Sequence, residues 1–414
     1  MAKTKTAKQL KKMTNGKKPK ETPEQLYASA IELVEQHQPE EALKQAKKLW
    51  TQVQNHSVSE ALPALNLLGE ISVELGEVDE ARVYFEEAVK LDPNGEVPEA
   101  LGGGAEKFLW LAQLCEEGGK ASVGWFEKGV TALQHEIAAL ENGSMNGRMD
   151  EESLLLLRVE KKRKLANALC GIVEVYMTDL SWEDDAETRC ENLITQAMTV
   201  EEETSPEVLQ TLASVRLSQE RKEDAQAALT RSLSSWKDLD SEDPAVPDFP
   251  TRISLARLLM EAEMEPDAMS VIQRLVSDDD QSVEAWYLGG WCQYLVAQKL
   301  AQNPANGSDG NTVMANDENS PSDERAVALK GSRNWLMQAQ KLYTLLEYED
   351  ERLLEHANEL VAELDTVLGP EAKQSESGEG DDGEWEEWGG IEDGEEQVGE
   401  GAEDVDEDEE MRDS

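Results

Sequence analysis

The residue types that most often carry out chemistry in proteins are scarce in this chain, and they form no catalytic or metal-binding pattern. The four histidines are dispersed, and none has a second histidine or a cysteine at metal-ligand spacing. We therefore interpret each of them as a residue of a helix surface: His37, His56, His135 and His356. The carboxylates are numerous but fall in unpatterned runs, so no pair can be assigned as general acid and general base.

Two glycine-containing segments resemble phosphate-binding loops only superficially. Residues 102–104 are three glycines, but no strand precedes them, and a dinucleotide fingerprint needs one. Gly119-Lys120 is followed by Ala121 where a P-loop needs Ser or Thr, and Leu114 occupies a position where that motif requires glycine. We therefore expect a protein that is not an enzyme and that binds no cofactor and no metal.

The cysteines and the hydropathy pattern indicate in which cellular compartment the protein is expected. Four cysteines lie far apart at apolar positions of predicted helices, which favours buried thiols in a reducing compartment: Cys115, Cys170, Cys190 and Cys292. No apolar run approaches the ~18–20 residues of a membrane span. The lysine-rich start lacks the apolar centre of a signal peptide. We expect a protein of the cytoplasm and nucleus that does not bind membranes.

The elements that could position functional side chains are clearest in residues 65–93, LNLLGEISVELGEVDEARVYFEEAVKLDP. Two amphipathic helices are predicted there, joined by a tight turn at Gly76. Small residues stand where the helices must approach closely, and an aromatic residue lies one turn after the first of these alanines: Gly69, Ala81, Phe85 and Ala88. This pattern resembles the tetratricopeptide repeat, a helix–turn–helix unit of about 34 residues that buries its apolar face only by stacking on neighbours.

Similar helix pairs are predicted on both sides of this unit. One begins at Thr22-Pro23, an N-cap followed by proline, and a later one carries AWYLGGWCQYL at residues 285–295. We predict an all-α, right-handed superhelical solenoid of tetratricopeptide-type helix hairpins over residues 22–369, with about six to eight repeats. A disordered insertion at about 303–323 is expected to interrupt the second helix of the unit that starts near Trp286. The final helix should end at Gly369-Pro370.

Charge is the dominant feature of the composition, with 88 acidic residues against 39 basic ones and a net charge of −49. Residues 1–20 contain eight lysines and no acid, whereas residues 371–414 contain 21 acids and two basic residues. The solenoid between these tails is therefore strongly acidic itself. Such a surface repels nucleic acid and anionic lipid and attracts basic protein segments over roughly 8–10 Å. A purely solubilising role for the acidity is the alternative.

Both tails have compositions that cannot pack a core, so residues 1–21 and 370–414 are expected to be disordered. Two lysine clusters in the first tail could act as a nuclear import signal or be a plain solvated tail: Lys11, Lys12, Lys17, Lys18 and Lys20. Trp385 and Trp388 in the acidic tail could dock on a partner, or they could be an unattached pair.

In tetratricopeptide repeats the exposed positions of the first helix of each pair line the concave face. The resemblance therefore implies a partner-binding set of Asn66, Glu70, Val73, Glu74, Glu207, Gln210, Ser214, Ile253, Arg257, Met260, Glu261, Glu284, Tyr287, Trp291 and Tyr294. A groove that mixes carboxylates with aromatic rings suits a Lys/Arg-rich extended peptide. For Trp291 and Tyr294, packing between repeats is the alternative. The acidic Glu70 and Glu74 argue against the binding of heat-shock-protein tails, which needs cationic residues.

The whole layout resembles the fungal dedicated assembly chaperones of large-subunit ribosomal protein L4. The shared features are the lysine-rich N-terminus, the repeat at 65–93, the AWYLGGWCQYL segment and the acidic tail with EWEEWGGIEDGEE. The resemblance implies a client with a basic, extended internal loop, which the chaperone shields, escorts through nuclear import and releases at the pre-ribosome. An import receptor is a further partner that this role implies. A histone chaperone, or a scaffold within a larger complex, remains an alternative.

Overall fold

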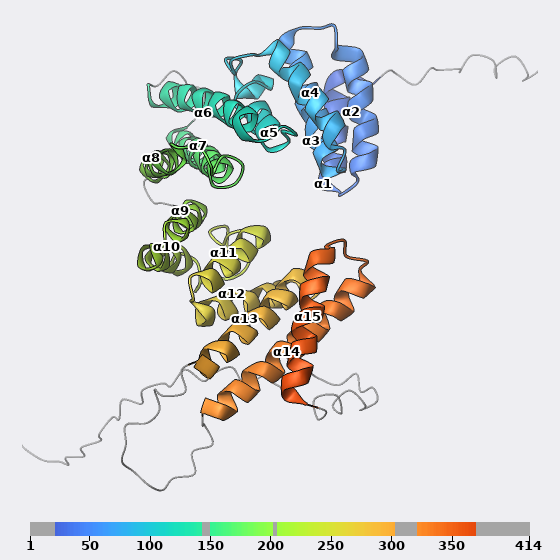
Figure 1. Cartoon of the computed structure of the whole chain (residues 1–414). Coiled ribbons are helices and arrows are strands. Elements are labelled where there is room, and N and C mark those ends of the chain that lie inside the picture. Colours follow the sequence, from blue (N-terminus) through green and yellow to red (C-terminus); the bar gives the residue numbers. More distant parts are fainter. Residues whose placement is uncertain (1–20, 143–149, 202–204, 303–320, 370–414) are drawn as a thin grey trace, which may run out of the picture. The chain divides into compact units, whose positions relative to one another are not determined.

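The computed structural model describes residues 21–142, 150–201, 205–302 and 321–369, and the regular structure within these ranges is entirely helical (Figure 1). Residues up to Leu364 belong to one compact unit, and residues 365–369, at the end of the last helix, belong to a second. The predicted tails and most of the predicted insertion at 303–323 lie outside the described residues.

Fourteen of the helices pair in chain order into seven hairpins. The hairpins are α1 (Pro23–Glu35) with α2 (Pro39–Val53), α3 (Val58–Glu74) with α4 (Val78–Leu91), α5 (Glu106–Gln113) with α6 (Gly119–Glu141), α7 (Glu151–Met177) with α8 (Ala186–Val200), α9 (Pro206–Ser218) with α10 (Lys222–Ser234), α11 (Phe249–Glu261) with α12 (Glu265–Asp278), and α13 (Val283–Gln302) with α14 (Pro321–Leu345). The chain continues into α15 (Glu351–Leu368), and a 3-10 helix η1 (Glu99–Leu101) precedes α5. Each helix packs on its hairpin partner and consecutive hairpins pack on one another, so the predicted all-α solenoid of helix hairpins is confirmed.

Local signals in the sequence set where these helices begin. The Thr22 hydroxyl accepts a hydrogen bond from the backbone N–H of Gln25, and the Gln25 side chain accepts one from the Thr22 N–H, which completes a capping box. Among the described residues, proline stands in the first turn of six helices (α1, α2, α9, α11, α12 and α14), where the N–H that it lacks would have no partner inside the helix.

Four hairpins share one turn geometry between their two helices. Each turn has three residues, and the middle residue has a positive φ: His37 (55°), Gly76 (72°), Glu220 (60°) and Glu263 (60°). In each turn, the backbone N–H of the next residue donates to a carbonyl five residues earlier, as in Glu77 N to Ser72 O at 2.8 Å. Such bonds satisfy carbonyls that the ending helix leaves open. Only one of the four positions is glycine, so the other three side chains are held in a less favoured conformation.

Close contact within hairpins depends on glycine facing a large ring. A Cβ atom added at Gly69 of α3 would lie 2.5 Å from the Phe85 ring of α4, which is itself fully buried. A Cβ atom at Gly289 of α13 would lie 2.2 Å from the Trp335 ring of α14. Because real Cβ atoms do not approach so closely, glycine is required where these helices meet. The small residues predicted from the 65–93 repeat are confirmed.

The segment between α4 and α7 is held by buried lysines. Lys107 is 1% exposed; its Nζ donates to Asp92 Oδ2 at 2.8 Å and to the Gly104 carbonyl at 2.6 Å. Lys161 of α7 lies 2.7 Å from carboxylate oxygens of both Glu99 and Glu136. These ion pairs fix η1 against α5, α6 and α7. They also explain why residues 96–200 show a loose repeat pattern in the sequence, because charged side chains replace part of the apolar contact.

Three sequence-based predictions need correction. The insertion does not interrupt a second helix: α13 runs unbroken for 20 residues to Gln302, and α14 resumes at Pro321, so the insertion connects the two helices of the last hairpin. The helix assigned to the 65–93 repeat starts earlier, at Val58, with Pro63 inside it. Cys115 is only half-buried, whereas the other three cysteines are buried.

Candidate functional site

The first helices of successive hairpins carry the predicted partner-binding residues. We call the surface that they form, the accessible side of α1, α3, α5, α7, α9, α11 and α13, the first-helix surface. Three grooves open on it, with volumes of about 630, 460 and 500 Å³ in chain order. We name them the N-terminal, middle and C-terminal grooves.

The N-terminal groove is formed by α1, α3, η1, α5 and α7, and it is strongly acidic. Five carboxylates line it against a single lysine: Glu24, Glu60, Glu70, Glu99 and Glu106, with Lys164. The Lys164 Nζ is already bound at 2.6 Å to Glu106 and at 3.2 Å to Glu160. Among the described residues, Glu24 and Glu70 form no ion pair. The groove therefore holds negative charge that the described residues do not neutralise.

Burial and this charge together raise the pKa values of two groups that face the groove. Glu70 keeps contact with solvent, but the surrounding walls partly bury it, and this burial together with the charge of Glu106 raises the pKa of its carboxyl above the usual range. Burial, and then the charge of Glu70, raises the pKa of Tyr27 across the groove. A cationic group placed between them would relieve both perturbations and would lie near an aromatic ring.

The middle groove is formed by α7, α9 and α11, and half of its lining residues are uncharged and polar. The apolar Met177 and Leu258 also line it, as does Arg257, whose guanidinium is paired with Glu284. Hydroxyl and amide side chains line it: Asn167, Gln210, Thr211, Ser214, Thr251 and Ser254. Glu174 and Glu207 supply its carboxylates, and neither forms an ion pair with a described residue. Burial raises the pKa of the Glu174 carboxyl. The thiol of Cys170 is unreactive, because burial raises its pKa to about 12.

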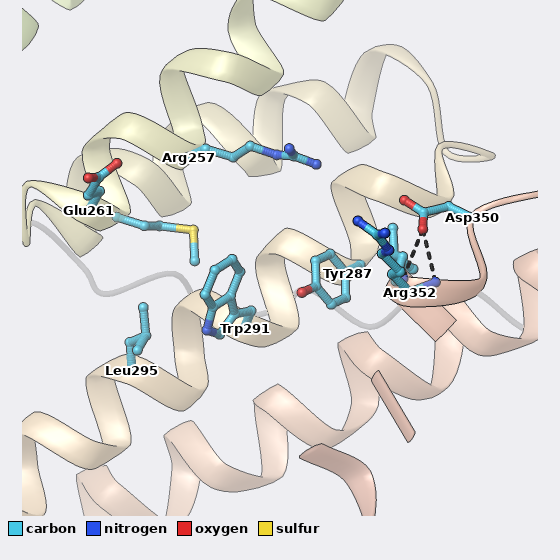
Figure 2. Close-up of a pocket in the computed structure, with 9 residues that line it drawn as sticks. Arg257, Glu261, Tyr287, Trp291, Leu295, Asp350 and Arg352 are labelled. Atoms are coloured by element: carbon cyan, nitrogen blue, oxygen red, sulfur yellow. Dashed lines mark hydrogen bonds between the residues drawn. The ribbon is translucent and has the colours of Figure 1, made fainter. Parts of the chain in front are cut away.

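The C-terminal groove is aromatic and balanced in charge. Figure 2 shows Tyr287 and Trp291 along α13, facing Arg257 and Glu261 of α11. Two further charged residues at the start of α15, Asp350 and Arg352, complete the balance. The Asp350 carboxylate accepts hydrogen bonds from the backbone N–H groups of Arg352 and Leu353, both at 3.1 Å, which caps α15 (Figure 2).

The structure brings ten of the fifteen predicted first-helix residues into these grooves: Asn66, Glu70, Glu207, Gln210, Ser214, Arg257, Met260, Glu261, Tyr287 and Trp291. Asn66 also has a structural role, because its Nδ2 donates to the Gly102 carbonyl at 2.8 Å. Two others lie apart: Glu74 is exposed at the end of α3 and lines none of the three grooves, and Glu284 is paired with Arg257. The remaining three, Val73, Ile253 and Tyr294, also line none of the three grooves.

Five residues predicted to be exposed are buried instead, and Gln210 of α9 is one of them. Tyr287 and Tyr294 are each 8% exposed, and Ile253 and Met260 are also buried. For the two tyrosines the reason is α15, which lies against α13: the Tyr287 hydroxyl lies 2.6 Å from His356 Nδ1, and Tyr294 is hydrogen-bonded to Glu363. Tyr294 therefore packs between helices, as the alternative interpretation held, whereas half-buried Trp291 reaches the groove.

The histidine interpretation also needs three corrections. His37 and His56 are exposed, but they lie in the connections between helices and not on a helix surface. His356 is not a helix-surface residue, because it is half-buried and packs against both aromatic rings of α13. Its ring centroid lies 5.8 Å from that of Tyr287 and 5.5 Å from that of Trp291. Among the described residues, no group of His, Cys, Asp and Glu could hold a metal ion, and no helix is long and apolar enough to cross a membrane.

Sequence reasoning missed several groove residues. Glu24 and Tyr27 occupy the second and fifth positions of the helix that begins at Pro23, so the rule applied to later repeats would have found them. Lys164 and Glu174 lie in the region of unresolved register, and no signal in the sequence marked them. The lysines of the proposed import signal and the tail residues Trp385 and Trp388 lie outside the described residues.

The hairpin geometry and the grooves along the first helices define a tetratricopeptide-repeat protein, and residues 63–94 match the Tetratricopeptide repeat family. Two curated relatives are each named "Probable assembly chaperone of rpl4". The one from Emericella nidulans is 47% identical over 91% of this chain and 90% of its own length. The one from Schizosaccharomyces pombe is 34% identical over 84% of this chain and 90% of its own length.

A solved structure entitled "Assembly Chaperone of RpL4 (Acl4) (Residues 1-338)" is also similar. It is 49% identical to this chain, with a TM-score of 0.62, and the match covers 69% of this chain and all of that one. The chain therefore belongs to the family of rpl4 assembly chaperones.

Proposed function

We propose that this protein is a dedicated chaperone of the large-subunit ribosomal protein L4 and that it binds the basic, extended loop of its client on the first-helix surface. Family membership supports the identity of the client. The observation that carries the binding mode is the N-terminal groove, where Glu24 and Glu70 form no ion pair with a described residue and the one lysine of the lining is already paired.

Each of the three grooves favours a different feature of the client. The N-terminal groove favours lysine and arginine side chains through charge, and Tyr27 adds an aromatic face. The middle groove offers polar groups to an extended chain, and the C-terminal groove offers the Trp291 ring beside paired charges. Because the acidity is concentrated in one groove, the most basic part of the client should lie on α1 and α3.

The chemistry of such a client explains why it needs a chaperone. A free basic loop binds RNA without discrimination, because each neutralised phosphate releases counterions. Carboxylates in the groove compete for the same cationic side chains until ribosomal RNA offers a denser line of phosphates. A disordered loop also loses conformational entropy on capture, which offsets part of the contact energy and keeps binding reversible. This role needs no catalytic group and no cofactor.

We further propose that the protein escorts L4 from the cytoplasm to nuclear pre-ribosomes. Two features support this proposal. One is the basic cluster of Lys11, Lys12, Lys17, Lys18 and Lys20. The other is the acidic surface, which repels RNA and therefore does not compete with the client for it. Alanine replacement of these five lysines in a fluorescently tagged chain should reduce nuclear accumulation without reducing L4 binding. Unchanged accumulation would show that the tail is not the import signal.

The test of the client is affinity purification of the full chain from cells, followed by binding measurements with recombinant L4 over a range of salt concentrations. We expect recovery of L4, including L4 on its translating ribosome, and a steep loss of affinity with rising salt. Recovery of histones in place of L4 would favour a histone chaperone. Recovery of a mixed set of acidic proteins, or affinity that is insensitive to salt, would contradict a charge-driven client chaperone.

A further inference from the structure

Gln210 in the middle groove is a buried polar residue that the fold itself does not use. It lies on α9 and is 6% exposed, and its Nε2 atom has no hydrogen-bond partner among the described residues. A buried amide without a partner destabilises a protein by the cost of its lost hydration. Because Gln210 has this cost in the free protein, the stability of the fold does not explain why a glutamine is present there.

The surroundings of Gln210 indicate what could satisfy it. On the three helices that form the groove, short hydroxyl and amide side chains stand in succession: Asn167 on α7, Ser214 on α9, and Ser254 on α11. No hydrogen bond joins these three side chains to other described residues. Because such groups both donate and accept, they match the alternating C=O and N–H groups of an extended main chain.

We infer that Gln210 binds the main-chain amide groups of the captured client segment. Its side-chain amide can donate to a peptide carbonyl and accept from a peptide N–H, and a half-turn about the last side-chain bond exchanges the two positions. Glu174 and Glu207 flank the site without ion-pair partners among the described residues and would attract an adjacent lysine or arginine. This inference rests on the proposed function. It adds a contact with main-chain groups of the client, which does not depend on the client's sequence.

A comparison with Gln226 separates this role from a purely structural one. Gln226 of the next helix is also partly buried, but its Nε2 donates to the Ala262 carbonyl at 2.8 Å and so joins α10 to the end of α11. We therefore expect replacement of the two glutamines to have opposite effects on the stability of the fold. Loss of Gln226 removes a bond of the fold, whereas loss of Gln210 removes an unsatisfied group.

The experiment compares the full chain with its Gln210→Met and Gln226→Met variants, because methionine keeps the length of glutamine without its polar atoms. For Gln210→Met, we expect affinity for recombinant L4 to fall about fivefold to tenfold at every salt concentration, because a neutral hydrogen bond is lost. Its thermal midpoint should stay the same or rise. For Gln226→Met, the midpoint should fall and the affinity should stay unchanged.

Two results would overturn the inference. One is a Gln210→Met variant that binds L4 as tightly as the unmodified chain, and the other is a loss of affinity that accompanies a lower thermal midpoint. If the unmodified chain does not bind L4 at all, the proposed function fails separately. The same two variants are then compared with poly-lysine as an extended basic probe, and equal affinities of Gln210→Met and the unmodified chain would also refute the inference.

Discussion

Replacement of Glu70 by glutamine should weaken client binding while leaving the fold as stable as before or more so. Glu70 lies in the N-terminal groove without an ion-pair partner among the described residues, and partial burial and the charge of Glu106 raise its pKa. Its ionised form is therefore a cost in the free protein and an attraction for a cationic client. Glu70→Gln removes both, so affinity and stability should change in opposite directions.

The size of the effect follows from the position of the carboxylate. Two unit charges 4 Å apart interact by about 1 kcal/mol in water and by about 4 kcal/mol at the effective dielectric constant near a protein surface. Glu70 keeps contact with solvent, and the client cation loses some hydration on binding, so we expect a loss of about 1–2 kcal/mol. This corresponds to a roughly fivefold to thirtyfold higher Kd for L4.

The control has the same change in net charge on the second helix of the same hairpin. Glu86 of α4 is exposed and lines none of the three grooves, so Glu86→Gln should leave the affinity unchanged. Calorimetric titration of L4 into each variant at low and high salt measures both Kd and its salt dependence. Equal Kd values for the two variants would refute the assignment of the N-terminal groove, and so would a Glu70→Gln variant whose salt dependence matches that of the unmodified chain.

The same residue predicts a pH dependence. Because its folded pKa is raised, the folded chain binds the Glu70 proton more tightly than the unfolded chain does, so this residue costs stability at neutral pH. The cost is relieved as the pH falls through the raised folded pKa, which lies above the ordinary glutamate value. Protonation also removes the attraction for the client. L4 affinity should therefore fall over this range, and the fall should be smaller in Glu70→Gln.

Three further predictions concern the fold that holds the grooves, each measured as a change in the free energy of unfolding by chemical denaturation. Gly69→Ala should destabilise by about 1–2 kcal/mol, because its Cβ would lie 2.5 Å from the Phe85 ring; no loss would contradict the contact. Lys107→Met should destabilise by about 3–5 kcal/mol, because Asp92 is left as a buried charge; a change below 1 kcal/mol would contradict the buried pair. Glu220→Gly should stabilise by up to about 1 kcal/mol, because φ is 60° there, and destabilisation would contradict the turn geometry.

The parts of the fold that could be predicted from the sequence depend on contacts between residues close in the chain. The N-cap at Thr22 and the close helix approach at Gly69 use residues within one hairpin, so their spacing in the sequence predicted them. The ion pairs of Lys161 with Glu99 and Glu136 join residues 25 or more positions apart, and no local pattern marks them. The repeat register between α4 and α7 could therefore not be predicted from the sequence.

The candidate site was predictable to a similar extent. Repeat positions identified Glu70 and Gln210, because the first helix of each unit exposes the same positions to the groove. They failed at Tyr294, because α15 covers that position and the repeat pattern does not describe a terminal helix. The uneven distribution of charge among the three grooves could also not be predicted, because Glu99 and Lys164 reach the N-terminal groove from outside the regular repeats.

The central claim, that the client lies along the first helices, is tested most directly by site-specific photo-crosslinking. A photoreactive amino acid is placed at Asn167 or Ser254, which are exposed in the middle groove, and in separate chains at Glu86 or Glu223 on second helices. Irradiation of the complex with L4 should give crosslinks from the first pair of positions and few from the second pair. Crosslinks of equal yield from both pairs, or crosslinks confined to the second helices, would contradict the account.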